Sequence, residues 1–373
     1  MNEDKPTVLD WFSRRLNLTE IFSLLTSYGI YYGELDSRKP LKEALAEAEQ
    51  RPVALYSRWP RILSLIAVVL IGLELLTGGL LALYYLPTPD SAHPSLGTIL
   101  RDVHFGDFVH QMHFWGAQLL ILVLILRVIR YFLGSVYKAP RELIWVFGAL
   151  LLLAAFHLDL TGRALPMTDQ GYWSSVRALE IVGAVPIYGP LVHFLVGGDG
   201  AFITELTLIR FYVLHVAVLP IVAVTLIYLY FSTIRRVGLG DAKHGNEVQS
   251  QRVLRSQLLT MAIVLTLVFG LLVTLAVIAP KPFEREADPF ATVPGVGPPW
   301  YLLAPFGFLE WMPRFVPQWI AGLILFLAFS FFLAVPFLDR SAKGSMGRWV
   351  ALTVGVLIMV AWLVFTIYGA RVA

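Results

Sequence analysis

The chain has 373 residues, of which 57% are hydrophobic and only 15% are charged, and its formal net charge is +3. Soluble proteins carry roughly 45–50% apolar and about 25% charged residues, so the composition excludes an ordinary soluble enzyme. The small net charge, spread over several loops, gives no indication of a nucleic-acid partner. The absence of cysteine excludes disulfides, thiolate metal sites and cysteine nucleophiles. The composition therefore predicts an integral membrane protein.

Residues 1–60 form a polar N-terminal segment. No short apolar run followed by a small-residue cleavage site lies near Met1, so we expect no signal peptide. Apolar side chains within this segment recur at helical spacing, which predicts an amphipathic helix at the membrane surface. These side chains are Trp11, Leu16, Leu18, Ile21, Phe22 and Leu25.

Seven apolar segments follow, and each is long enough to cross the hydrocarbon core as a helix. They lie near residues 61–85, 108–133, 141–161, 206–234, 256–279, 317–337 and 348–370. We therefore expect an all-α membrane fold with seven transmembrane helices. A charged linker, 237–255, separates a four-helix part, 61–236, from a three-helix part, 256–373.

Basic residues are distributed unevenly between the two sets of connections. Twelve lie at the second, fourth and sixth connections counted from the N-terminus, and six lie at the first, third and fifth. This asymmetry predicts a cytoplasmic N-terminus and an external C-terminus in a cytoplasmic (inner) membrane. The outer connections 162–205 and 280–316 are long and rich in proline, glycine and aromatic residues, so we expect packed structure there that forms a pocket.

The histidines are the best candidates for cofactor chemistry. Only His113 and His215 fall clearly within predicted spans, each roughly two turns from the outer end. Two histidines at similar depth on neighbouring helices could bind one haem iron from both sides. Gly78 and Gly116 lie at comparable depth and would give a flat porphyrin access to the backbone. The alternative is two unrelated buried histidines that bond to carbonyl groups.

Motifs along most of the chain carry a family resemblance. The first part contains Asp10-Trp11-Phe12, Leu76-Thr77-Gly78, His113-Phe114-Trp115-Gly116-Ala117, Pro140-Arg141-Glu142-Leu143-Ile144-Trp145, Thr161-Gly162, Gly171-Tyr172-Trp173 and Val185-Pro186-Ile187-Tyr188-Gly189. The second contains Asp288-Pro289-Phe290-Ala291-Thr292, Pro298-Pro299-Trp300-Tyr301 and Val335-Pro336-Phe337-Leu338. In these motifs the chain resembles cytochrome b of the bc1/b6f type, in particular cytochrome b6 fused to subunit IV, over about residues 8–370.

The resemblance implies two stacked haems, but the second, inner pair of ligands is missing. Fourteen residues after His113, about four turns on the same face, stands Arg127, whose guanidinium has no lone pair for iron. The matching position after His215 is Tyr230, or Leu229 at the shorter spacing. We therefore expect one haem b, at the outer site. Arg127 either occupies the inner site, pairing with a lipid phosphate or a carboxylate, or extends to the headgroups, as we expect for Arg130.

The family's outer quinol site is also altered, because Pro299 replaces the glutamate of a Pro-Glu-Trp-Tyr motif. A proline cannot accept the quinol proton. Substitutes in or near the outer loops are Glu310, Asp169, His157 and His193, although each is more simply explained as a structural or solvated polar group. Trp173, Trp300 and Tyr301 are the candidate residues of a quinone pocket, and Arg210 and His110 the candidate contacts of the haem propionates.

The sequence therefore predicts a mono-haem cytochrome b subunit that relays electrons at the outer face. It would connect quinone or a neighbouring haem to a Rieske-type protein, a c-type cytochrome or another external redox subunit, beside other membrane subunits. It would be part of an oxidoreductase complex rather than a stand-alone enzyme, without a full Q-cycle. A structural subunit with a vestigial or absent haem is the alternative. A transporter is disfavoured, because Glu74 is the only carboxylate expected deep in a span.

Overall fold

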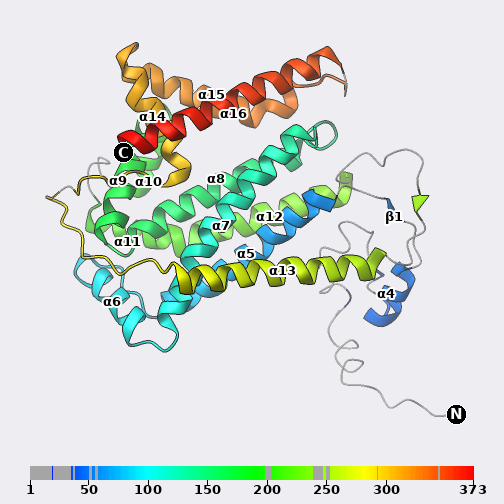
Figure 1. Cartoon of the computed structure of the whole chain (residues 1–373), viewed down its shortest axis with the longest axis horizontal. Helices are drawn as coiled ribbons and strands as arrows, with labels where there is room; N and C mark the ends of the chain where they lie inside the picture. Colours follow the sequence, from blue (N-terminus) through cyan, green and yellow to red (C-terminus); the bar gives the residue numbers. More distant parts are fainter. Residues whose placement is uncertain are drawn as a thin grey trace.

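The computed structural model describes residues 19, 35–36, 38–49, 53–54, 58–197, 203–237, 247–248, 253–291, 293–342 and 345–373. Within these ranges the chain is almost entirely helical (Figure 1). The predicted amphipathic helix at 11–25 and most of the linker 237–255 lie outside the described residues. A short helix, α4 (Leu41–Glu49), and a two-residue strand, β1 (Val53–Ala54), precede the first helical part. A second two-residue strand, β2 (Glu247–Val248), follows this part and pairs with β1 in antiparallel fashion.

Seven helices of the described chain are long and apolar enough to cross a membrane, which confirms the predicted number. They are α5 (Arg58–Ala82), α7 (Gly106–Leu133), α8 (Glu142–Ala164), the continuous run from α11 (Glu205–Val213) to α12 (Leu219–Val237), α13 (Val253–Ile278), α15 (Gln318–Leu338) and α16 (Met346–Val372). Side-chain hydroxyls cap several helix starts: Thr204 accepts from the Thr207 amide, and Ser345 from the Arg348 amide.

Packed structure was expected only for the connections 162–205 and 280–316. All three connections on the side predicted to be external contain short helices. They are α6 (Pro89–Arg101), α9 (Asp169–Gly183), α10 (Tyr188–Val196), η2 (Trp300–Leu302), α14 (Leu303–Trp311) and η3 (Met312–Arg314). Residues of α9 and α10 share a hydrophobic core with α8 and α11, in which Tyr172, Leu208 and Phe211 are completely buried. This packing fixes the outer ends of the transmembrane helices.

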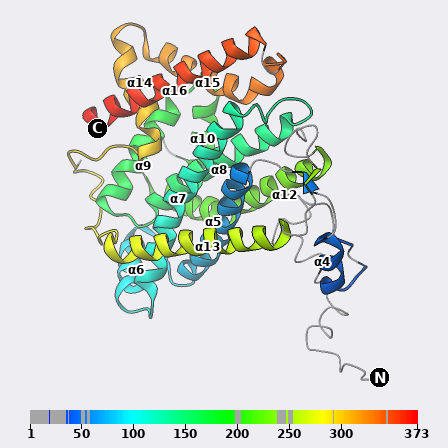
Figure 2. The ribbon, with the colours of Figure 1, turned by 45° about the vertical axis from the view of Figure 1, so that its right-hand side comes forward.

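The helices lie in layers that both views of the ribbon show. In Figures 1 and 2, α15 and α16 lie on one side of α8, and α5, α7 and α12 lie on its other side, with α13 beyond them. A second core, formed by α5, α7, α8, α12 and α13, contains the fully buried Leu70, Ile121, Leu124 and Leu272. The four-helix part thus encloses a packed interior, and α13 covers α5 and α7.

A polar cluster, which we call the inner tie, joins the four-helix part to the three-helix part. Its members are Tyr137 and Lys138 between α7 and α8, and Asp339, Ser341 and Arg348 around the connection of α15 to α16. Lys138 Nζ lies 2.9 Å from Asp339 Oδ1, and Arg348 Nη1 lies 3.2 Å from Asp339 Oδ2. Arg348 also donates to Tyr137 Oη at 2.6 Å and to the Phe132 carbonyl at 2.7 Å. The tie is therefore a buried network of charge-assisted bonds.

One helix is interrupted by a π-helical turn, η1 (Leu214–Val218), in which the Leu219 amide donates to the Leu214 carbonyl. Pro220 follows directly and has no amide hydrogen for the α-helical bond to residue 216. Such turns commonly occur at functional sites, and this one contains His215.

Candidate functional site

His113 on α7 and His215 on η1 face each other inside the four-helix part. Their ring centroids are 6.1 Å apart, and the ring planes are nearly perpendicular, at 89°. The sequence predicted that these two residues lie at similar depth, and the fold brings their rings together.

The Nδ1 atom of His113 is held by partners on α5. It lies 2.9 Å from Glu74 Oε2 and 2.9 Å from Thr77 Oγ1, and Thr77 itself donates to the Leu73 carbonyl at 2.7 Å. A neutral ring that donates its Nδ1 hydrogen presents the lone pair of Nε2. A carboxylate acceptor also raises the basicity of a ligating imidazole.

The Nδ1 atom of His215 is held in the same way by α8. It lies 3.0 Å from the Leu158 carbonyl oxygen and 3.3 Å from Thr161 Oγ1. The carbonyl can only accept, so His215 carries its hydrogen on Nδ1 and its lone pair on Nε2. In both rings, therefore, the contacts that hold the ring use Nδ1 and leave the lone pair of Nε2 for another partner.

Glycines bring α5 and α8 close to the two rings. A Cβ atom on Gly78 would lie 3.0 Å from His113 Cε1, and a Cβ atom on Gly162 would overlap His215 Cε1. We predicted that Gly116 leaves room for the porphyrin, but it lies against the Glu74 carboxylate instead. In each of the pairs Thr77-Gly78 and Thr161-Gly162, the threonine faces Nδ1 and the glycine faces the ring.

Sequence reasoning missed the role of Thr161 and Gly162, although a signal was present. Leu76-Thr77-Gly78 on the first predicted span and Leu160-Thr161-Gly162 on the third are the same tripeptide. A repeat at equal depth on two helices indicates two equivalent contacts with a central group.

At the other end of the bundle, Arg127 is 3% exposed and lies between two tyrosine rings. Its Cζ atom is 4.2 Å from the ring centroid of Tyr230 and 4.9 Å from that of Tyr131. The two tyrosine hydroxyls lie 2.6 Å apart. A Cβ atom on Gly148 of α8 would lie 3.1 Å from Arg127 Nη1. The side chain is therefore buried within the bundle and does not extend to the surface.

A buried carboxylate that sequence reasoning missed lies beside the altered quinol motif. Asp159 of α8 accepts from Tyr301 Oη at 2.7 Å and Arg163 Nη2 at 2.8 Å through Oδ2, and from Gln118 Nε2 at 2.8 Å through Oδ1. Trp300 Nε1 donates to Gln118 Oε1 at 2.9 Å. Glu74 was expected to be the only carboxylate deep in a span, and Asp159, five residues before the end of α8, is a second buried carboxylate within one.

Tyr301 lies at the centre of this network. Its ring stacks on Phe156 with centroids 4.6 Å apart. Burial, and then the negative charge of Asp159, raises the pKa of the Tyr301 hydroxyl well above its usual range. Tyr301 is therefore a hydrogen-bond donor and not a proton acceptor.

The other predicted site residues are separated. Trp173 is buried against Tyr172 in the core of α9, apart from the exposed Trp300. Arg210 Nη1 donates to the Phe194 carbonyl at 3.3 Å, at the end of α10. The Nδ1 atom of His110 is buried without a hydrogen-bond partner among the described residues.

The four residues considered as substitutes for the quinol carboxylate are also accounted for. Asp169 pairs with Arg285, and His157 contacts the Leu153 carbonyl and the Tyr188 hydroxyl. Glu310 is exposed on α14, and a Cβ atom on Gly183 would lie 2.7 Å from His193 Nε2. None of these arrangements places the four groups in one pocket within the described chain.

Comparison with known proteins identifies the family. Residues 49–238 match the model of "Cytochrome b/b6/petB", and residues 286–373 match that of "Cytochrome b(C-terminal)/b6/petD". The chain belongs to the cytochrome b/b6 family. Curated relatives include cytochrome b6 of Heliomicrobium gestii, 40% identical over 45% of this chain and 78% of that protein. The cytochrome b subunit of the menaquinol:cytochrome c reductase of Geobacillus thermodenitrificans is 35% identical over 45% of this chain and 75% of that protein.

A solved structure titled "Hyperthermophilic respiratory Complex III" shares the fold of this cytochrome b. The match has a TM-score of 0.73 at 23% identity and covers 97% of this chain and 91% of the other. The first family model ends at residue 238 and the second begins at residue 286, so α13 lies between the two matched ranges.

Membership in the cytochrome b family implies haem b, and the residues around His113 and His215 fit this group. The two imidazoles are fixed through Nδ1, so His113 and His215 are the residues that would hold the haem iron through Nε2. Gly78 and Gly162 remove the side-chain bulk that would displace the rings. Among the described residues, no cluster of three or more His, Cys, Asp or Glu side chains offers an alternative metal site.

Proposed function

We propose that this cytochrome b is a one-haem subunit of a membrane quinol:cytochrome oxidoreductase complex, and that it relays electrons at the outer face. The observation that carries the proposal is the pair of facing histidines, each oriented through Nδ1 by a neighbouring helix. His113 and His215 would hold a haem, which would supply reversible one-electron chemistry. The chain supplies its orientation: α5 and α8 hold the rings, and the π-helical turn places His215 opposite His113.

The arrangement at the other end supports a single haem. Arg127 stands fourteen residues after His113, and Tyr230 fifteen after His215. A guanidinium has no lone pair, and the Tyr230 hydroxyl is bonded to Tyr131. Without an inner haem, no second carrier continues the path across the membrane, so a complete Q-cycle is not expected.

The outer connections are the proposed site of exchange with quinone and an external partner. Trp300 and Tyr301 are anchored to α7 and α8 through Gln118 and Asp159, which fixes η2 over the outer end of the bundle. Pro299 gives no group that accepts a proton, and Asp159 is engaged by three donors. The partner proposed at this face is a Rieske-type or c-type cytochrome subunit, or another external redox subunit.

The test is the haem content of the purified full-length chain, measured by pyridine haemochrome and a dithionite-reduced spectrum. We expect one haem b per chain, no haem in His113→Ala or His215→Ala, and unchanged haem in Arg127→Ala. Two haems per chain would contradict the proposal, as would loss of haem in Arg127→Ala alone. No haem in the unaltered chain would favour the alternative of a structural subunit.

A further inference from the structure

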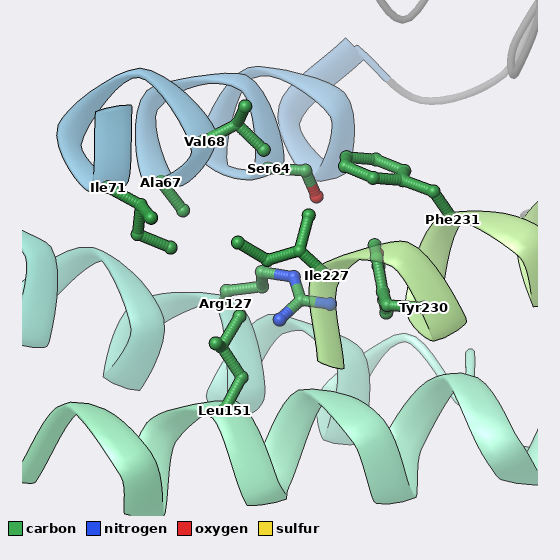
Figure 3. A pocket seen from close by; sticks show the side chains of 9 residues that line it. All are labelled: Ser64, Ala67, Val68, Ile71, Arg127, Leu151, Ile227, Tyr230 and Phe231. Carbon is green, nitrogen blue, oxygen red and sulfur yellow. The ribbon is translucent and has the colours of Figure 1, made fainter. Parts of the chain in front are cut away.

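A pocket lies near the end of the four-helix bundle that is opposite to the proposed haem site. It is lined mainly by apolar side chains of α5, α8 and α12, and the Arg127 side chain of α7 lies among them (Figure 3). The lining residues are Ser64, Ala67, Val68, Ile71, Leu151, Ile227, Tyr230 and Phe231. The only charged group of the lining is therefore a guanidinium.

The Arg127 guanidinium has one free edge. Its Nε and Nη2 atoms are both buried and have no hydrogen-bond partner among the described residues. Its Cζ atom lies 4.2 Å from the ring centroid of Tyr230 and 4.9 Å from that of Tyr131, and a Cβ atom on Gly148 would lie 3.1 Å from Nη1 and 3.2 Å from Nη2. Nε and Nη2 carry two parallel N–H bonds, which are the donors that bind a carboxylate through both oxygens.

No carboxylate of the described chain pairs with this cation, whose nearest charged or polar partners are the two tyrosines. A buried charge without a counterion is costly, so an anion that enters the pocket gains strongly from the contact. Arg127 lies six residues before the end of α7, which is about 9 Å along the axis and within the hydrocarbon core. The anion must therefore be carried by a molecule that dissolves in the bilayer.

One side of the pocket is formed by half-buried side chains of α5 and α12. Ile71 and Leu151 are buried, whereas Val68, Ile227 and Phe231 are half-buried and form the rim. An apolar tail leaving between these side chains would remain in the hydrocarbon. A phosphodiester headgroup would bring further oxygens and a glycerol unit, for which the lining offers only the hydroxyls of Ser64 and Tyr230.

We propose that this pocket binds the carboxylate of a long-chain fatty acid, with the head group on the Nε–Nη2 edge of Arg127 and the tail between α5 and α12. This site is independent of the proposed haem. It gives the inner half of the chain a ligand-binding role at the position where the family resemblance implies a second haem.

The experiment uses the full-length chain in detergent and a palmitic acid that carries a photoreactive diazirine on its tail. We expect the probe to label peptides of α5 or α12 that line the pocket. Labelling should fall about tenfold or more in Arg127→Gln, which loses both the charge and the paired donors. Arg130→Gln, one turn further along the same helix, is the matched control and should label like the unaltered chain.

Two further arms keep the result decisive. Ile227→Trp fills the rim while Arg127 stays in place, and it should also lose labelling even if Arg127→Gln does not fold. The methyl ester of the same probe has the tail without the charge and should label only at background. Unlabelled palmitate should compete with the probe, and phosphatidylglycerol or a quinone should not.

Three outcomes would overturn the proposal. Equal labelling of Arg127→Gln and Arg130→Gln would show that the guanidinium is not the anchor. Equal labelling by acid and ester would indicate a merely apolar groove. Competition by phosphatidylglycerol or a quinone, but not by palmitate, would assign the pocket to a different ligand.

Discussion

The glycines beside the two histidines differ in how tightly they confine the rings. A Cβ atom at Gly162 would overlap His215 Cε1, one at Gly78 would lie 3.0 Å from His113 Cε1, and one at Gly79 would meet nothing within 4 Å. The three positions therefore form a graded series in which a single methyl group is added at decreasing steric cost.

We expect Gly162→Ala to lower bound haem several-fold, because His215 must rotate away from Thr161 to make room for the methyl group. Gly78→Ala should have an intermediate effect, and Gly79→Ala should bind haem like the unaltered chain. The measurement is haem per chain by pyridine haemochrome. Equal haem content in Gly162→Ala and Gly79→Ala would contradict the placement of the ring.

The position of a residue along its helix could be predicted from the sequence, but the side of the helix on which its neighbours lie could not. His113 and His215 could be selected because a polar ring within an apolar span is costly and because both stand near the same end. Asp159 and Thr161 were not selected, since their role depends on which face of α8 turns toward α7, η1 and η2. Arg127 could be placed at the inner site but not oriented, because snorkelling and burial are both compatible with its position.

The π-helical turn is the element that sets the direction of His215. Leu219 donates to Leu214 five residues back, and Pro220 cannot make the α-helical bond to residue 216. A shift of the helix by one residue rotates its side chains about the axis by about 100°. The π-helical turn therefore determines whether His215 faces His113.

Replacing Pro220 with alanine restores the missing amide and favours the α-helical register. We expect Pro220→Ala to lose haem several-fold without a lower melting temperature of the haem-free chain, since a better helix former has replaced proline. Pro336→Ala, within α15, is the control and should keep its haem. Circular dichroism and the reduced haem spectrum measure the two effects. Unchanged haem in Pro220→Ala would show that the turn does not depend on the proline.

At the scale of elements, hydropathy predicts long helices well and short ones poorly. The seven spans were predicted to within a few residues because each is a continuous apolar run. The helices α9, α10 and α14 were expected only as packed loops, and α6 was not predicted at all, because nine to fifteen residues containing proline, glycine and polar groups show no such run. The π-helical turn leaves no distinctive pattern other than Pro220.

The inner tie is one of the contacts between the two parts of the molecule, and its centre is the carboxylate of Asp339. This side chain is 8% exposed, and Lys138 and Arg348 are 12% and 5% exposed. Burial alone would raise the pKa of Asp339, but hydrogen bonds from Ser341, Tyr137 and Lys138 and the charge of Lys138 lower it far below its usual range. The ionised carboxylate is therefore the form that the folded state requires.

We expect Asp339→Asn to lower the free energy of unfolding by about 3–5 kcal/mol, because two buried cations lose their shared partner. The folded-state pKa lies below the unfolded value of about 3.9, so the contribution of Asp339 is complete above that value and is lost as the pH falls below it. The stability difference between the unaltered chain and Asp339→Asn should narrow below about pH 4. Denaturant unfolding in detergent at pH 7 and pH 3.5 measures it.

The exposed Glu310 provides the control, since Glu310→Gln removes a carboxylate outside the tie. A difference between Asp339→Asn and the unaltered chain that stays constant from pH 7 to pH 3.5 would exclude the ionised carboxylate as its source.

The inner tie also bears on how the molecule is assembled. Tyr137 and Lys138 belong to the part that matches the b6-type model, and Asp339 and Arg348 to the part that matches the petD-type model. Trp145 adds a bond from its indole Nε1 to the Phe332 carbonyl at 2.9 Å, again between the two parts. These side-chain contacts determine which surfaces of the two parts pack together and in which orientation. They do not depend on the two parts being joined in one chain. Two separately synthesised polypeptides, divided within the linker, would carry all the information needed to find each other in the bilayer.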